Sequence, residues 1–330
     1  MPGKHKFDEQ LAGLAALRER PPEAHVEPLR KALAHRNNLM VAKAADLVRE
    51  FGLTDLTPDL VSAFDRFFEN PAKSDPQCWA KNALSRALAT FELQDADLFL
   101  RGMRHIQMEG VWGGKADSAG TLRATCAQAL VQCRRVADTE LLSHLLELFA
   151  DTETSVRAEA ANAIEQIGSP AASLVLRLRA VLGNDEPAVL GACYAGVLRI
   201  EGVSAIPWVS RRLAPADDTA AEAALAIAGT HTPEGFDALR DALGDASDPW
   251  FRSVLLSAIA LTRQDAALEF LFSLIVGESQ TGEAAIAAIL RALPSPDVVR
   301  RLEALVEGNP RLAGAFAAHQ PSRSTRASSR

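Results

Sequence analysis

An amphipathic helical stripe recurs along most of this 330-residue chain, and this recurrence restricts the possible folds more than any other feature. In residues 156–164, apolar residues or Ala occupy the first, fifth, eighth and ninth positions, which lie on one face of an α-helix. Successive stripes are 39 and 43 residues apart at first and then 30–34 residues apart. A period of this length is typical of repeat proteins. The stripes begin at Met40, Trp79, Leu122, Val156, Val189, Ala220, Phe251 and Thr281.

A second amphipathic helix is expected between successive stripes. The expected segments are 140–149, 173–182, 236–243, 266–276 and 296–306. Turns rich in Gly, Pro and Asp separate them from the stripes, in the order that ends one helix and starts the next. Hydrophobic residues make up 48% of the chain and aromatic residues only 5%, so Ala and Leu supply most of the core. Since these two residues favour helices, the sequence predicts an all-α protein without strands.

The spacing Asp151-x5-Arg157-x2-Ala160-x3-Ile164-x3-Gly168 resembles the HEAT repeat, in the short form called the PBS-lyase HEAT-like repeat. The resemblance implies a right-handed α-solenoid of about eight stacked helix-turn-helix repeats. In such families, Asp and Arg form a ladder between stacked repeats. The ladder residues that the resemblance implies here are Asp117, Arg123, Asp151, Arg157, Asp245 and Arg252. Val41, Ala80, Leu190, Ala221 and Gly282 stand at the Arg position elsewhere, so the ladder is expected to be interrupted.

The repeat region is expected to cover residues 22–308. Residues 1–21 are predicted to form a capping helix over the first repeat, and residues 309–320 a capping helix over the last. Residues 321–330 contain only Pro, Ser, Arg, Thr and Ala, and we expect this Ser/Arg tail to be disordered.

The widest interval contains an irregular insertion, residues 104–121, which we expect to be a loop. It holds four glycines together with His105, Glu109, Trp112 and Lys115, and insertions in repeat arrays often serve binding. Two interpretations are open. Trp112 either fills a gap that the longer loop leaves over the core, or the loop recognises a partner.

The later stripes suggest a second surface. Positions seven and ten of each stripe point away from the core, and in the second half of the chain they are small or apolar. These positions are Ala195, Leu198, Ala226, Ser257, Ala287 and Leu290. The sequence allows two readings of them: crowding between inner helices on the concave face, or a groove for an amphipathic helix or an extended peptide.

No catalytic, metal-binding or cofactor-binding motif is found. The seven histidines include no pair at i, i+4, and the four cysteines form no Cys-x2-Cys pair, so we expect reduced thiols, no cofactor and a cytoplasmic protein. No signal peptide or membrane span is expected. The net charge of −7 disfavours nucleic acid as a partner. Arg86, Arg134, Arg135 and Arg199 could form a local basic patch, although solvated helix charge is the simpler interpretation.

The sequence therefore favours a non-catalytic scaffold of bacterial type that binds another protein through its concave face and through the loop around Trp112. The alternative is an enzyme that acts through that loop, because HEAT-like repeats also occur in proteins of phycobilin attachment and in alkylpurine DNA glycosylases. No residue set of either group is found in this chain.

Overall fold

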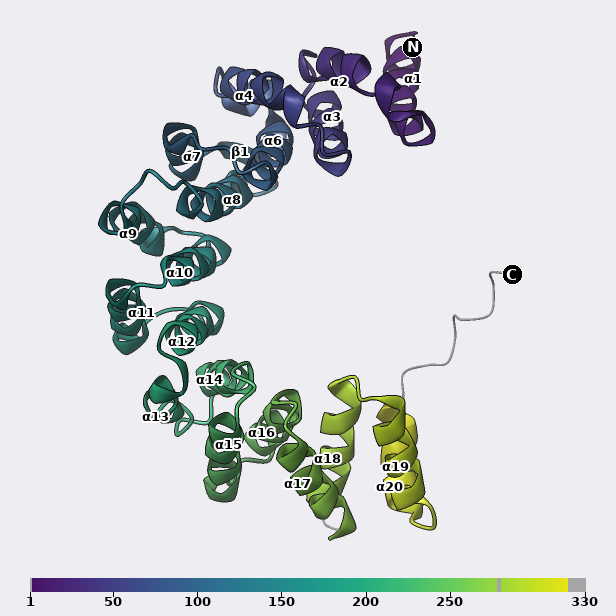
Figure 1. Ribbon diagram of the computed structural model, residues 1–330, viewed down its shortest axis with the longest axis vertical. Coiled ribbons are helices and arrows are strands. Elements are labelled where there is room, and N and C mark those ends of the chain that lie inside the picture. Colours follow the sequence, from purple (N-terminus) through teal and green to yellow (C-terminus); the bar gives the residue numbers. More distant parts are fainter. Residues whose placement is uncertain (1, 278–279, 320–330) are drawn as a thin grey trace. The chain divides into compact units, whose positions relative to one another are not determined.

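The computed structural model describes residues 2–277 and 280–319 (Figure 1). The described chain is helical apart from its turns and one short hairpin, which confirms the all-α class. It divides into two compact units, residues 1–167 (unit 1) and residues 168–330 (unit 2). The tail predicted to be disordered, residues 321–330, lies outside the described residues.

Unit 1 is built of α-helices that start at capping side chains. The Asn37 side chain accepts a hydrogen bond from the amide of Met40, and Asp95 caps a later helix in the same way. The helices are α1 (Pro2–Ala15), α2 (Val26–Leu33), α3 (Asn38–Glu50), α4 (Thr57–Arg66), α5 (Pro71–Ser74), α6 (Trp79–Thr90), α7 (Ala96–Met103), α8 (Gly120–Val131), α9 (Asp138–Glu147) and α10 (Thr154–Ile167). Short 3-10 helices are η1 (Ala16–Glu19), η2 (Pro22–Ala24), η3 (Thr54–Leu56), η4 (Pro76–Cys78) and η5 (Leu148–Ala150).

Helices of unit 2 also begin at capping side chains, and Pro is often their first residue. Ser169, Thr232, Asp248 and Ser295 each cap a helix whose first residue is Pro, where the missing amide proton costs nothing. The helices are α11 (Pro170–Leu182), α12 (Pro187–Glu201), α13 (Ile206–Ser210), α14 (Asp218–Ala228), α15 (Pro233–Asp245), α16 (Pro249–Leu261), α17 (Asp265–Val276), α18 (Gln280–Arg291), α19 (Pro296–Val306) and α20 (Pro310–His319), with the 3-10 helix η6 (Gly202–Ala205).

In each unit, a row of helices packs one against the next. In unit 1 the row is α3, α6, α8 and α10, and in unit 2 it is α12, α14, α16, α18 and α20 (Figure 1). All eight predicted stripes lie on these helices, and the remaining long helices flank the row. Small residues such as Ala83, Ala160 and Ala224 are buried in it, which lets neighbouring helices approach closely.

The stretch Pro187–Ser210 is long and apolar enough to cross a membrane by composition, and 56% of its most apolar window is buried inside the protein. It contains α12, which packs against both α11 and α14. This burial is what a core helix of a folded unit requires.

One stripe is displaced by a residue from its predicted register. Trp79 was expected in the core, but its side chain is 47% exposed, and Ala80 and Lys81 are buried instead. The cause is the backbone before α6, where Gln77 and Cys78 adopt left-handed conformations with φ of 60° and 52°. These two residues rotate the start of the helix relative to the simple pattern.

The first part of the predicted ladder is formed. The Arg123 guanidinium donates to Asp151 at 2.6 and 2.9 Å and also to the Asp117 carboxylate. All three side chains are at most 9% exposed. Arg157 donates to the backbone carbonyl oxygens of Asp151 at 2.8 Å and Thr152 at 3.1 Å.

Two ladder predictions need correction. Arg252 donates to the carbonyl oxygens of Leu243 and Ala246, both at 2.8 Å, and the exposed Asp245 carboxylate makes no ion pair with it within the described residues. At Ala80 the ladder was expected to be interrupted. Instead Lys81, one residue further along, forms a fully buried ion pair of 3.0 Å with Asp75. This repeat therefore has a cation near the ladder position.

We expect replacement of Arg123 by Met to destabilise unit 1 by about 3–5 kcal/mol, because two buried carboxylates would lose their shared cation. Chemical denaturation monitored by circular dichroism measures this loss. The control is Arg134→Met, whose side chain is 82% exposed beside Glu92 and whose loss should cost about 0.5 kcal/mol or less. Equal effects of the two substitutions would contradict a structural role for the Arg123 cluster.

Candidate functional site

The predicted loop of residues 104–121 is a β-hairpin, so the expectation of a chain without strands is wrong at this point. Strands β1 (Met108–Val111) and β2 (Gly114–Asp117) pair antiparallel, with Met108 opposite Asp117 and Val111 opposite Gly114. Trp112 and Gly113 form the two-residue turn, and Gly113 has φ of +90°, a conformation that suits glycine.

The Glu109 carboxylate fastens the hairpin to unit 1. One of its oxygens, Oε1, accepts hydrogen bonds from the Gln77 amide at 2.7 Å, the Gln107 side chain at 2.6 Å and the Ser118 hydroxyl at 2.6 Å. Partial burial acts to raise the pKa of Glu109, but the hydrogen bonds from Ser118, Gln107 and Gln77 outweigh it and hold that pKa below its ordinary value. Glu109 is therefore an ionised anchor at neutral pH.

A second set of contacts lies beneath the hairpin. The Gln107 side chain also donates to the backbone carbonyl of Asp75 at 2.8 Å. The Asp75 carboxylate in turn accepts from the amides of Ala80 at 2.9 Å and Lys81 at 3.0 Å, and from the Asn38 side chain at 3.0 Å. The hairpin, the start of α6 and the start of α3 are thus tied into one network.

Asp75 and Lys81 were not predicted from the sequence as a ladder pair. Their six-residue offset equals that of Asp117 and Arg123, and this spacing would have identified them if Lys had been accepted in place of Arg. The displaced register of α6 concealed the match.

Two groups near the hairpin, Cys78 and His105, have side chains of catalytic types. Burial raises the pKa of the Cys78 thiol to about 11, so the thiol is protonated at neutral pH and is a poor nucleophile. Burial lowers the pKa of the half-buried His105, so its imidazole is neutral. The imidazole Nε2 lies 3.2 Å from Oε1 of Gln107 and the Cys78 Sγ lies 3.7 Å from the Ser118 hydroxyl, so the described hydrogen bonds do not join the two groups as nucleophile and base. No cluster that could hold a metal ion occurs among the described residues.

The side chain of Trp112 is 103% exposed, so it does not fill a gap over the core and that interpretation is wrong. Val111, which directly precedes it, is 52% exposed, and two further exposed apolar side chains lie before and at the start of β1, Ile106 at 65% and Met108 at 50%. Lys115 on β2 is exposed as well. The hairpin thus presents an exposed indole at its turn, on a base fixed by hydrogen bonds.

In unit 2 the structure brings three of the predicted contact residues together. Ala195 and Leu198 of α12 and Ala226 of α14 line one groove of about 480 Å³, with Val203 and Leu225 at its exposed margin. Part of the predicted apolar surface is therefore hollowed and accessible.

The other predicted contact residues do not contribute to this groove. Ala287 is 8% exposed and Leu290 is 4% exposed, so both belong to the core around α18. Ser257 is half-buried, and its hydroxyl donates to the backbone carbonyl of Ser253 at 2.9 Å. For α18, crowding between helices accounts for the small and apolar residues.

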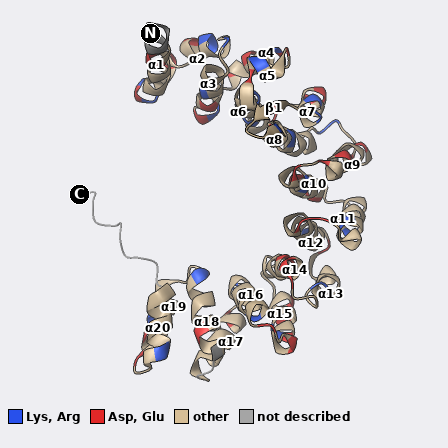
Figure 2. Ribbon diagram, turned by 180° about the vertical axis from the view of Figure 1, so that it is seen from behind, with Lys and Arg blue, Asp and Glu red and all other residues tan. Residues whose placement is uncertain are grey.

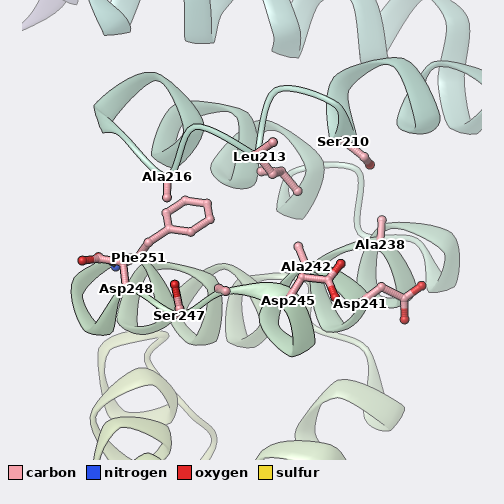
Figure 3. A pocket seen from close by; sticks show the side chains of 12 residues that line it. Ser210, Leu213, Ala216, Ala238, Asp241, Ala242, Asp245, Ser247, Asp248 and Phe251 are labelled. Atoms are coloured by element: carbon pink, nitrogen blue, oxygen red, sulfur yellow. Dashed lines mark hydrogen bonds between the residues drawn. The ribbon is translucent and has the colours of Figure 1, made fainter.

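A further groove, of about 570 Å³, was missed in the sequence. It lies between the segment after α13 and the pair α15 and α16 (Figure 3). Asp241 and Asp245 lie toward one end of it, and Asp248 lies beside Phe251 at the other. The Asp248 carboxylate accepts from the Phe251 amide at 2.7 Å, which fixes the start of α16. The groove is formed by residues far apart in the sequence, and no local pattern marks it.

Basic residues are mixed with acidic ones along both units (Figure 2). Of the arginines considered as a basic patch, Arg86 lies 3.5 Å from Asp46 and Arg134 lies 3.7 Å from Glu92. These pairings neutralise the two arginines locally and weaken any continuous basic surface.

No protein-family model matches the chain, and no curated protein matches it significantly. The geometry of the hairpin and of the grooves is therefore the basis for an assignment of function.

We expect Glu109→Gln to destabilise unit 1 by about 1 kcal/mol at neutral pH, because a neutral amide oxygen replaces the charged acceptor of the hydrogen bonds from Gln77, Gln107 and Ser118 at a partly exposed site. The folded-state pKa of Glu109 is depressed below 4.5, so its stabilisation is present above that pH and disappears as pH falls through the folded pKa. Melting temperatures of both proteins should therefore converge as pH falls below the folded-state pKa of Glu109, where both side chains are uncharged.

The matched control for this experiment is Glu23→Gln, an exposed carboxylate in the same unit. It should shift the melting temperature little at any pH. A Glu109→Gln difference that stays constant from neutral to acidic pH would show that the charge of Glu109 does not stabilise the hairpin.

Proposed function

We propose that this chain is a non-catalytic scaffold that binds another protein and that its helices form a right-handed solenoid of HEAT-like repeats. The row of packed helices within each unit supports this arrangement, since each row helix is followed or preceded by a flanking helix through a short turn. A solenoid offers an extended surface for a partner. The four cysteines are free and buried, which supports a reducing, cytoplasmic setting.

The observation that carries the proposal is the fully exposed indole of Trp112 on an anchored hairpin. Exposing a Trp side chain to water is unfavourable, and Trp is among the residues that contribute most to binding energy at protein interfaces. The hydrogen bonds of Glu109 fix the hairpin before binding, so little conformational entropy is lost when a partner is engaged.

The shape of the hairpin indicates the kind of partner. Trp112 protrudes, and a protruding side chain needs a pocket on the other protein. We therefore infer a folded partner with an apolar pocket for the indole and a rim that contacts Val111, which adjoins the turn. Lys115 beside the turn favours an acidic group at that rim.

The groove of Ala195, Leu198 and Ala226 supplies a second contact of the opposite shape. Its volume of about 480 Å³ suits the apolar side chains of an amphipathic helix or of an extended segment. Ala195, Gly202, Ala226 and Gly229 in its lining are small, which leaves room for a partner helix near the backbone of α14.

The enzyme alternative has less support. The Cys78 thiol near the hairpin is buried and protonated, its described hydrogen bond goes to Ser118 and not to His105, and Oε1 of Glu109 anchors the hairpin. Nucleic acid is disfavoured by the local pairing of Arg86 and Arg134 and by the net charge of −7.

Trp112→Ala should weaken partner binding by at least about tenfold without lowering the melting temperature, because the indole contacts no core. Affinity purification from the native cell with quantitative mass spectrometry identifies partners, and titration of the purified partner gives the affinity.

The control for exposed aromatic surface is Trp250→Ala, because Trp250 is 48% exposed in unit 2. This variant should retain the partner. Recovery of the same partners with unchanged affinity by Trp112→Ala would remove the hairpin from the proposed interface.

Ala226→Glu should block the groove by adding a long, charged side chain to its lining, and partner affinity should again fall about tenfold or more, with helix content unchanged. Ala188→Glu is the matched control, since Ala188 is exposed in the first turn of α12, where an acidic residue is tolerated. Unchanged affinity for Ala226→Glu, measured with the partner found above, would exclude the groove.

A further inference from the structure

Helix α11 carries a row of large apolar side chains on its exposed side. Leu174 is 67% exposed, Leu178 61%, Val181 58% and Leu182 60%. With the exposed Ala171, the spacing along the row is three, four and three residues, which is the a/d pattern of a helix that pairs with another helix. We call these five residues the α11 seam.

The core of unit 2 does not need this seam. The opposite side of α11 buries Ala172, Ser173, Leu176 and Ala180, and α11 packs on α12. The helix is therefore apolar on two sides, whereas a helix at the surface of a unit is expected to have one polar side. An apolar side that the fold does not bury is typical of an interface.

The charges that flank the seam are already neutralised. The Arg177 guanidinium donates to Glu201 at 2.8 Å and stacks on the Trp208 ring at 4.4 Å from the ring centroid. Arg179 is paired with Asp185. The seam itself holds no charged residue. It therefore does not select a partner of opposite charge, and two copies of the seam can meet without like-charge repulsion.

We propose that the α11 seam is covered by the α11 seam of a second copy of this chain, with the two helices antiparallel about a two-fold axis. An uncharged row that is spaced as a/d positions is complementary to itself in this arrangement. Thirteen residues of helix extend over about 20 Å, which places Leu178 near the middle of the pair.

The area of the seam sets the strength of this dimer. At about 100 Å² for each of the four large side chains, the pair buries roughly 800 Å² in total, which is below the 1,200–2,000 Å² or so of a standard stable interface. The dimer is therefore weak, and its population depends on protein concentration.

Sedimentation velocity of the full chain tests the proposal. The mass of the wild-type protein should rise with concentration from 35.3 kDa toward twice that value. Leu178→Glu should remain monomeric at concentrations at least tenfold higher, because it brings two carboxylates together in an apolar seam. Val276→Glu is the control, since Val276 is 65% exposed on α17 and should leave the association unchanged.

A cysteine variant tests the geometry. Leu178→Cys should form an intermolecular disulfide on mild oxidation, since antiparallel seams bring this residue next to its own copy, and the four native cysteines are buried. Val276→Cys should not. A wild-type protein that is monomeric at all concentrations overturns the proposal, as does a Leu178→Glu variant that still dimerises. Dimerisation without the Leu178→Cys crosslink overturns the antiparallel arrangement.

Discussion

The structure depends on close packing between successive row helices, each of which is buried on more than one side. A helix in this position can carry only side chains that leave room for both neighbours, so Ala is frequent among the buried residues of α6 and α14. Gly191 of α12 shows how tight the approach is, because a Cβ at this position would collide with the side chain of Glu222 on α14. The shortage of aromatic residues follows from the same requirement.

Buried charge is concentrated in unit 1, where the chain leaves the regular helix pairs. The Asp75 carboxylate accepts hydrogen bonds from the backbone amides of Ala80 and Lys81 at the distorted start of α6, and Arg123 joins two carboxylates below the hairpin. Charges are costly to bury unless each has good partners, so these clusters admit few alternative geometries. The same rigidity makes the hairpin a fixed platform for Trp112, and it connects the energetics of the fold to the proposed binding site.

The sequence anticipated the helices well because the apolar stripe is a local property. All eight stripes lie on helices, and the predicted segment 296–306 coincides with α19. It anticipated the site only in part. Glu109, Trp112 and Lys115 do lie on one hairpin, with His105 just before it, but the Gly-rich segment gave no alternation by which strands could be recognised. Among the predicted groove residues, Ala195 and Ala226 line a groove, while Ala287 is buried.

What the sequence by itself determined is therefore the helical class, the order of the helices and most residues of the buried stripes, because these follow from periodicity and capping within one segment. Tertiary structure alone decided which outward positions stay in contact with water. It buried Leu290 and exposed Trp112 and the α11 seam, since exposure depends on neighbours that are distant in the chain. The pairing of Lys81 with Asp75 was decided in the same way, by a backbone distortion that no helical period encodes.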